Sequence, residues 1–130
     1  MVDQLIKHID HWGPAVVCAV LIFGFSHQSD PPGSEWFAAY DYVGHFFEYG
    51  IFAFTLVWGI TSKLNHPLTG KSLAAVCAVS LVYALSDEWH QQLIPNREAS
   101  LADVAVDMLG AIVCVMTVYV ARKINCLWRS

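Results

Sequence analysis

The chain has 130 residues, which is the size of a single domain. Hydrophobic residues make up 56% of it and charged residues 14%, whereas soluble domains average about 45–50% and about 25%. This composition and the mean hydropathy of +0.47 favour a polytopic membrane protein over a soluble helical bundle. The net charge is −4 and there is no basic patch or stripe, which argues against nucleic-acid binding.

Four apolar runs separated by short polar segments predict an all-α protein. We place its four transmembrane helices at about residues 12–27, 41–60, 72–91 and 101–121, within one membrane domain spanning residues 1–130. The residues before the first run carry apolar positions at helical spacing, as in a short interfacial helix. No signal-peptide order of basic region, apolar core and cleavage site precedes that run, so we expect the span to be retained.

Turn and capping residues mark the ends of these helices. The Ser-Asp-Pro-Pro-Gly-Ser sequence at residues 29–34 predicts a turn. Ser72 and Ser100 are predicted N-caps of the third and fourth helices, with Asp103 as the acidic partner of a capping box. Three glycines within the spans are expected to permit close helix approach: Gly44, Gly50 and Gly110.

Basic residues near the span ends predict the orientation, because cytoplasmic loops are enriched in Lys and Arg. With four spans, six of the basic residues fall on one side, namely Lys7, Lys63, Lys71, Arg122, Lys123 and Arg129. Only Arg97 falls on the other side. We therefore expect both termini to be cytoplasmic.

Polar side chains concentrate on the opposite side, at the ends of all four predicted helices. On three helices they recur at spacings of three or four residues, which places each set on one helix face. These sets are Asp41, His45 and Glu48; Asp87 and Gln91; and Asp103 and Asp107. Ionisable groups in membrane spans are costly, so they point to function. We predict that the three faces converge on a polar, acidic pocket open to the outside or to the outer leaflet.

Several segments carry a recognisable combination of motifs. FSHQSD follows the first span, HFFEYGIFAF lies in the second, and LSDEWHQQLIPNREASLADVAVDMLGA joins the third to the fourth. They contain His45-Phe46 with Tyr49, Asp87-Glu88-x-x-Gln91, Pro95-x-Arg97 and Asp103. Over about residues 20 to 115 this pattern resembles the VanZ-like family of bacterial membrane proteins.

The resemblance implies a multi-pass protein of the bacterial cytoplasmic (inner) membrane. The family is named for a protein associated with resistance to the glycopeptide teicoplanin, so a link to antibiotic resistance and the cell envelope is implied as well. The chain departs from the pattern in two places. Tyr42 stands where members often have lysine, and Asp107 stands where many have asparagine.

The leading hypothesis is that the pocket engages an envelope lipid or a lipid-linked cell-wall component. Arg97 is suited to binding a phosphate or carboxylate through two hydrogen bonds. The competing structural interpretation is a set of hydrogen bonds and ion pairs that joins the helices. The candidate ligand-binding residues are Asp41, His45, Glu48, Tyr49, Asp87, Glu88, Gln91, Arg97, Asp103 and Asp107.

Two further functions stay open. An intramembrane enzyme acting on a lipid phosphate or acyl group would use Asp87, Glu88 or His45, although no nucleophile motif surrounds Ser26 or Ser86. A proton-coupled transporter would use the chain of carboxylates. A divalent metal held by His45 and Glu48 together with Asp87 or Asp103 is a further alternative. Because there is no HExxH or paired-histidine spacing to support it, we expect neither a metal site nor a cofactor. The chain is also compatible with a homo-oligomer.

Overall fold

The structure is a computed structural model that describes residues 2–28, 38–95 and 97–127, with side chains for all of these except 2, 3, 5, 7, 8, 38–41, 126 and 127. It confirms the all-α class, because every regular element in the described part of the chain is a helix. The helices are α1 (Val2–Ser26), α2 (Ala38–Ile60), α3 (Gly70–Gln91) and α4 (Leu101–Leu127). The turn predicted at residues 29–34 lies outside the described residues.

All four helices are long and apolar enough to cross a membrane, as predicted. The qualifying segments are Ile9–Ser26, Tyr42–Ile60, Gly70–Gln91 and Leu101–Asn125. Their outer surfaces are apolar too: Leu101, Val82 and Val20 are exposed to 82%, 68% and 65%. Water would not favour so much exposed hydrocarbon, whereas a bilayer accommodates it.

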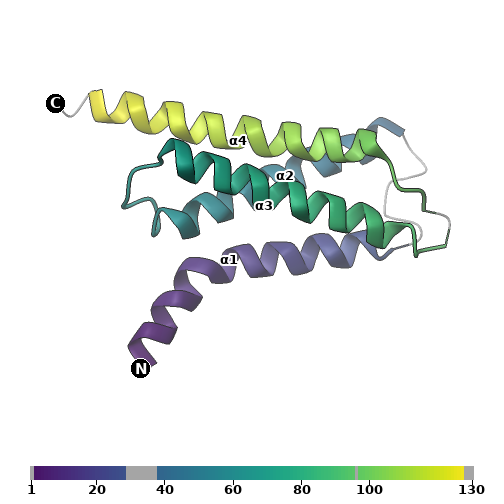
Figure 1. Cartoon of the computed structure of the whole chain (residues 1–130), viewed down its shortest axis with the longest axis horizontal. Helices are drawn as coiled ribbons and strands as arrows, with labels where there is room; N and C mark the ends of the chain where they lie inside the picture. The colour runs from purple at the N-terminus through teal and green to yellow at the C-terminus, as the bar shows by residue number, and fades with distance from the viewer. Residues whose placement is uncertain (1, 29–37, 96, 128–130) are drawn as a thin grey trace.

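The helices form an up-and-down bundle in which successive helices run antiparallel (Figure 1). The two described ends of the chain therefore lie toward the same end of the bundle, although which side of a membrane this end faces stays a prediction. The opposite end, where α1 and α3 finish and α2 and α4 begin, is called the polar end below. α2 and α4 run parallel and pack most extensively against each other, while α1 lies on the outside of the bundle.

Glycine makes the contact between α2 and α4 possible. A Cβ on Gly110 would overlap the backbone carbonyl of Phe46, and one on Gly50 would lie 3.5 Å from the carbonyl oxygen of Gly110. The expectation of close helix approach is therefore right for these two residues. It is wrong for Gly44, because a Cβ there would meet no atom within 4 Å.

α1 extends beyond the predicted first span at its N-terminal side and continues through Pro14. The helix bends in this region (Figure 1), as expected where proline removes one backbone donor and crowds the preceding turn. Near the bend, the Trp12 ring packs over Gly59 at the end of α2, and Asp10 forms an ion pair with Lys63. The separate interfacial helix expected before residue 12 is thus the first part of α1.

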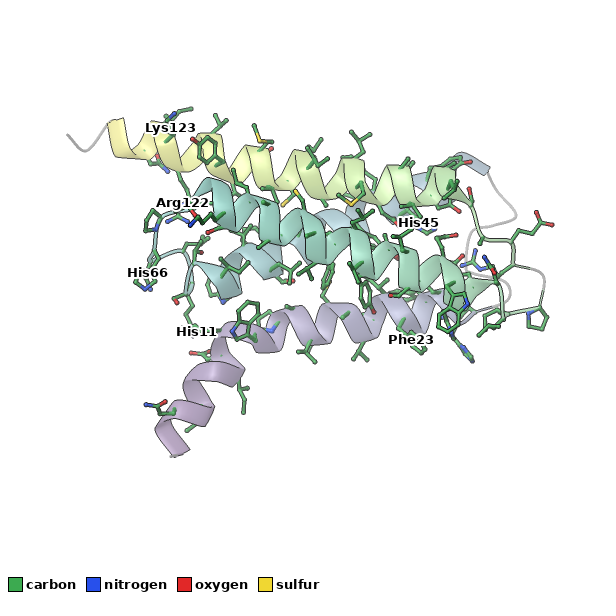
Figure 2. All side chains as sticks on the ribbon, in the orientation of Figure 1. His11, Phe23, His45, His66, Arg122 and Lys123 are labelled. Atoms are coloured by element: carbon green, nitrogen blue, oxygen red, sulfur yellow. The ribbon has the colours of Figure 1, made fainter. Side chains whose placement is uncertain are left out.

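The connection between α2 and α3 contains three successive non-glycine residues with left-handed backbone conformation: Ser62, Lys63 and Leu64. Arg122 of α4 holds this connection, because its Nη2 donates hydrogen bonds to the carbonyl oxygens of Leu64 and His66, at 2.8 and 2.7 Å. Figure 2 shows Arg122 and His66 at the bundle end opposite His45.

The N-cap prediction for the third helix is wrong by three residues. Thr69 is the cap, and its hydroxyl accepts a hydrogen bond from the backbone N–H of Ser72. Ser72 belongs to the first turn of α3, which begins at Gly70 and so two residues before the predicted span. Ser100 does cap α4, since its Oγ accepts a hydrogen bond from Ala102 N at 3.1 Å.

Candidate functional site

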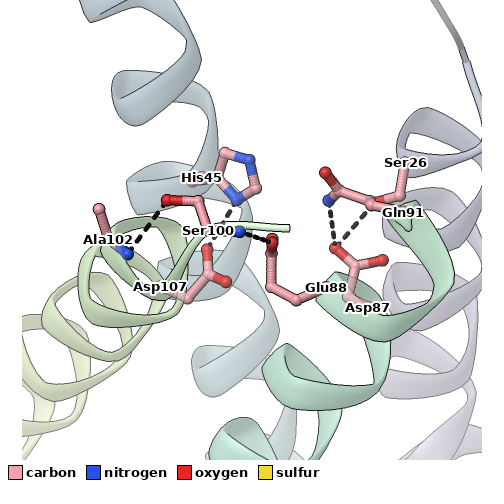
Figure 3. A network of polar contacts seen from close by, with 8 residues as sticks. All are labelled: Ser26, His45, Asp87, Glu88, Gln91, Ser100, Ala102 and Asp107. Atoms are coloured by element: carbon pink, nitrogen blue, oxygen red, sulfur yellow. Dashed lines mark hydrogen bonds and ion pairs between the residues drawn. The ribbon is translucent and has the colours of Figure 1, made fainter. Parts of the chain in front are cut away.

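The polar end brings together buried polar side chains from all four helices. Its most buried polar residues are exposed by 8% or less: Ser26, His45, Asp87, Glu88, Gln91, Asp103 and Asp107. Figure 3 shows most of this group as two neighbouring networks. One joins α2 to α4 and α4 to α3, and the other joins α3 to α1.

His45 and Asp107 link α2 to α4. His45 Nδ1 and Asp107 Oδ1 are 2.9 Å apart, and both side chains are buried. The two helices run parallel and meet closely at Gly110, one turn after Asp107 on α4. Residues 45 and 107 therefore lie opposite each other. The pair places an imidazole and a carboxylate in direct contact, an arrangement that also orients histidine in acid–base sites.

Asp87 organises the second network, between α3 and α1. Its Oδ2 accepts one hydrogen bond from Ser26 Oγ at 2.8 Å and a second from Gln91 Nε2 at 3.2 Å. Gln91 lies one turn along α3, at the spacing that the sequence predicted to share a face. Asp87 Oδ1 is buried without a hydrogen-bond partner among the described residues. The network is therefore incomplete as it stands.

Glu88 links α3 to the start of α4. Its Oε2 accepts a hydrogen bond from the backbone N–H of Ser100, at 2.7 Å. In a capping box, the backbone N–H of the capping residue donates to the acidic side chain three residues later in the same helix. Here Glu88 of the preceding helix binds the N–H that the sequence assigned to Asp103, and this contact joins the two helices.

The remaining predicted residues occupy different settings. Glu48 and Arg97 are half-buried, and Arg97 lies in the loop that joins α3 to α4 at the polar end. Tyr49 is fully buried with Phe52 and Tyr83 around its ring, so it belongs to the apolar core beneath the networks. The side chain of Asp41 lies outside the described residues.

Two polar contacts were not assigned to the site from the sequence. Ser26 lies at the polar end of the first span and is not among the candidate ligand-binding residues, yet it donates to Asp87. His27 Nδ1 and His90 Nε2 lie 3.2 Å apart, and both rings stack with Phe23. The signal for Ser26 was its place in the FSHQSD segment, at the same depth as the other polar ends.

Two adjacent hollows along α3, together called the groove below, lead to this site. Near the polar end a hollow of about 230 Å³ is lined by Phe23, Tyr83, Asp87 and His90 among others. A second hollow of about 340 Å³ continues toward the middle of α3, along Val79 and Val82. The two hollows share Tyr83 and Ser86, so they follow one another along the helix.

The chemistry available at the polar end is that of carboxylates, one imidazole and nearby amide and hydroxyl donors. His45, Glu88 and Asp107 each offer a metal-ligand atom, and the three atoms lie within 4.8 Å of one another. No motif spacing revealed this set, because the three residues belong to three different helices.

Comparison with known protein families decides the assignment. The sequence profile of the VanZ/LLP1 family matches residues 14–122, which include most of the described bundle and every residue of the two networks. The chain belongs to the VanZ/LLP1 family. The resemblance noted in the sequence motifs is thereby confirmed. With four helices able to span a membrane, the assignment indicates a multi-pass membrane protein. Neither the curated proteins nor the solved structures gave a match.

Proposed function

We propose that the polar end binds the headgroup of an envelope lipid or of a lipid-linked cell-wall component, in the bacterial cytoplasmic membrane. The observation that carries the proposal is the groove along α3, which is apolar along Val79 and Val82 and ends at Asp87. A lipid has this same order of parts, an acyl chain followed by a polar headgroup.

The polar groups at the end of the groove suit a headgroup. Asp87 has a buried carboxylate oxygen with no hydrogen-bond partner among the described residues, which a hydroxyl or ammonium of a headgroup would satisfy. Arg97 does not line the groove, but it is the only basic residue in the adjacent loop between α3 and α4. Its guanidinium has the geometry to bind a phosphate through paired hydrogen bonds.

The test is mass spectrometry of lipids that remain bound after purification in detergent. Wild-type protein is expected to retain one headgroup class, and Arg97→Ala is expected to lose it. Glu98→Ala is the matched control, since it removes an exposed charge from the neighbouring position in the same loop. Val82→Trp, which fills the groove, is expected to lower lipid occupancy while Arg97 is intact. No enriched lipid in the wild type, or equal lipid in all four proteins, would contradict the proposal.

Family membership extends the proposal to glycopeptide resistance, because glycopeptides act on lipid-linked cell-wall precursors. Expression of the wild type is expected to raise the teicoplanin concentration that inhibits growth, and Arg97→Ala is expected to remove this protection at equal protein level. An unchanged inhibitory concentration on wild-type expression would confine the proposal to lipid binding.

An intramembrane enzyme is the second candidate, and the His45–Asp107 contact favours it. A carboxylate bound to one ring nitrogen of histidine orients the other nitrogen for proton transfer. In this case His45→Gln would abolish conversion of a phosphorylated or acylated lipid in reconstituted vesicles, while the variant keeps its bound lipid. Full conversion by His45→Gln would exclude His45 as the catalytic base.

A further inference from the structure

Three buried side chains from three helices meet between the two networks. His45, Glu88 and Asp107 are exposed to 7%, 5% and 0%, and come from α2, α3 and α4. One ligand atom of each lies within 4.8 Å of the other two. Figure 3 shows the carboxylates of Glu88 and Asp107 directed toward the same space, beside the His45 ring.

The distances suit ligands of a common ion. In octahedral coordination, two ligand atoms at about 2.1 Å from a metal lie about 3.0 Å apart when they are adjacent and about 4.2 Å apart when they are opposite. In tetrahedral coordination, which Zn²⁺ favours, every pair lies about 3.4 Å apart. His45 Nδ1 and Asp107 Oδ1 are separated by 2.9 Å, the adjacent case. The widest separation in the set is 4.8 Å at most. Side-chain movement has to shorten it by up to about 0.6 Å for an opposite pair in an octahedral site, and by up to about 1.4 Å for a tetrahedral site.

An independent observation points to a ligand at the same place. Asp107 Oδ2 and Glu88 Oε1 are both buried and have no hydrogen-bond partner among the described residues. A buried carboxylate oxygen without a partner is destabilising, and native structures satisfy nearly all such atoms. The contact with His45 and the cap on Ser100 occupy only one oxygen of each carboxylate. The hydrogen bonds that join the helices therefore account for only one of the two oxygens of each carboxylate.

We propose that His45, Glu88 and Asp107 bind a divalent metal ion, with Zn²⁺ or Mn²⁺ as the ions that one imidazole and two carboxylates favour. The ion displaces the proton between Nδ1 and Oδ1, since histidine and carboxylate bind metals in their deprotonated forms. Asp107 binds it through both carboxylate oxygens and Glu88 through Oε1, so that the two oxygens without a partner are satisfied. Two carboxylates and a divalent cation are electrically neutral together, which suits an apolar bundle. The site does not depend on lipid binding.

The experiment measures metal bound to the full-length protein in detergent, purified through a tag without histidine. After chelator treatment, Zn²⁺ or Mn²⁺ is added, excess ion is removed, and bound metal is counted by elemental mass spectrometry. We expect about one ion per chain and a higher midpoint of thermal unfolding, because an ion that binds only the folded state stabilises it. His45→Ala, Glu88→Gln and Asp107→Asn are each expected to lower the bound metal at least tenfold at limiting ion concentration.

Two controls separate this site from others. Asp103→Asn removes a buried carboxylate one turn away on the same helix, and His27→Ala removes the histidine paired with His90. Both are expected to keep the ion. Loss of metal in His27→Ala with retention in His45→Ala would overturn the assignment, as would equal metal in wild type and all three ligand variants.

A measurement on the wild type covers the case in which the ligand variants do not fold. Co²⁺ replaces Zn²⁺ in such sites, and its visible spectrum reports the ligand set and the coordination geometry. A spectrum that saturates at one equivalent and indicates nitrogen and oxygen ligands supports the site. Absence of saturable Co²⁺, Zn²⁺ and Mn²⁺ binding by the wild type would overturn it, and so would binding of Ca²⁺ or Mg²⁺ alone.

Discussion

α2 and α4 approach each other closely at Gly110, which lies one turn from Asp107 at the site. A Cβ there would overlap the backbone of Phe46, which cannot move aside as a flexible side chain could. Gly110→Ala should therefore separate the helices and displace Asp107 from His45. Forced overpacking of this kind costs about 1–3 kcal/mol.

The measurement for Gly110→Ala is the thermal unfolding midpoint in detergent, which we expect to fall. Gly44→Ala is the matched control on the facing helix, because a Cβ there meets nothing within 4 Å. Alanine is the better helix former by about 1 kcal/mol, so the control should be neutral or stabilising. A midpoint for Gly110→Ala equal to or above that of Gly44→Ala would show that the helices do not meet at this glycine.

The sequence could predict which side chains share a helix face, but not which side chains meet across helices. Asp87 and Gln91 were assigned to one face by their spacing, and they are hydrogen-bonded. Ser26 and Asp87 are 61 positions apart, and no periodicity connects residues at that separation. The same limit applies to the proposed metal-ligand set, because spacing rules such as HExxH describe ligands on one helix, whereas His45, Glu88 and Asp107 come from three.

The helices themselves were easier to predict from the sequence, because each follows from a long apolar run. A helix start that depends on one capping residue was harder to predict. Four apolar runs gave four helices, because a bilayer-length run satisfies its own backbone only as a helix. The start of α3 was misplaced because Thr69 and Ser72 are both good capping residues, and only the backbone geometry shows that Thr69 holds the cap position. The continuity of α1 through Pro14 was missed for a related reason, since proline suits a first turn as well as a bend.

Arg122 of α4 is hydrogen-bonded to the segment between α2 and α3, in which three residues have left-handed backbone conformation. These hydrogen bonds should contribute to the stability of the fold. Arg122→Ala leaves the carbonyl oxygens of Leu64 and His66 without their donor. Hydrogen bonds from a charged group contribute about 2 kcal/mol where they are shielded from water. Half-burial of Arg122 makes this an upper value.

We expect Arg122→Ala to lower the unfolding midpoint and to make residues 62–68 more susceptible to limited proteolysis. Lys71→Ala is the control, because it removes an exposed positive charge close to the same connection. Arg122→Lys should recover little of the loss, since one ammonium cannot reproduce the planar donor group. Equal proteolysis of the alanine variant and the wild type would mean that the connection holds its shape without Arg122.

At the scale of the whole molecule, the bundle has two chemically different ends. One end carries Arg122, Lys63 and both described ends of the chain, and the other carries the buried acids and Arg97. Because successive helices run in opposite directions, the polar segments that alternate along the sequence fall at alternate ends of the bundle. The two different ends predict an orientation in the membrane, because basic loops are retained on the cytoplasmic side.

This orientation predicts which loops a membrane-impermeant thiol reagent can reach in intact cells. In a variant whose native cysteines are replaced by serine, His66→Cys and Glu98→Cys each place one thiol at an exposed position, in the α2–α3 and α3–α4 connections. We expect labelling of Glu98→Cys in intact cells, and labelling of His66→Cys only after the membrane is permeabilised. The reverse pattern would place the polar end in the cytoplasm, where an outer-leaflet lipid could not reach it. Labelling of both thiols in intact cells would contradict a bundle that spans the membrane with its two ends on opposite sides.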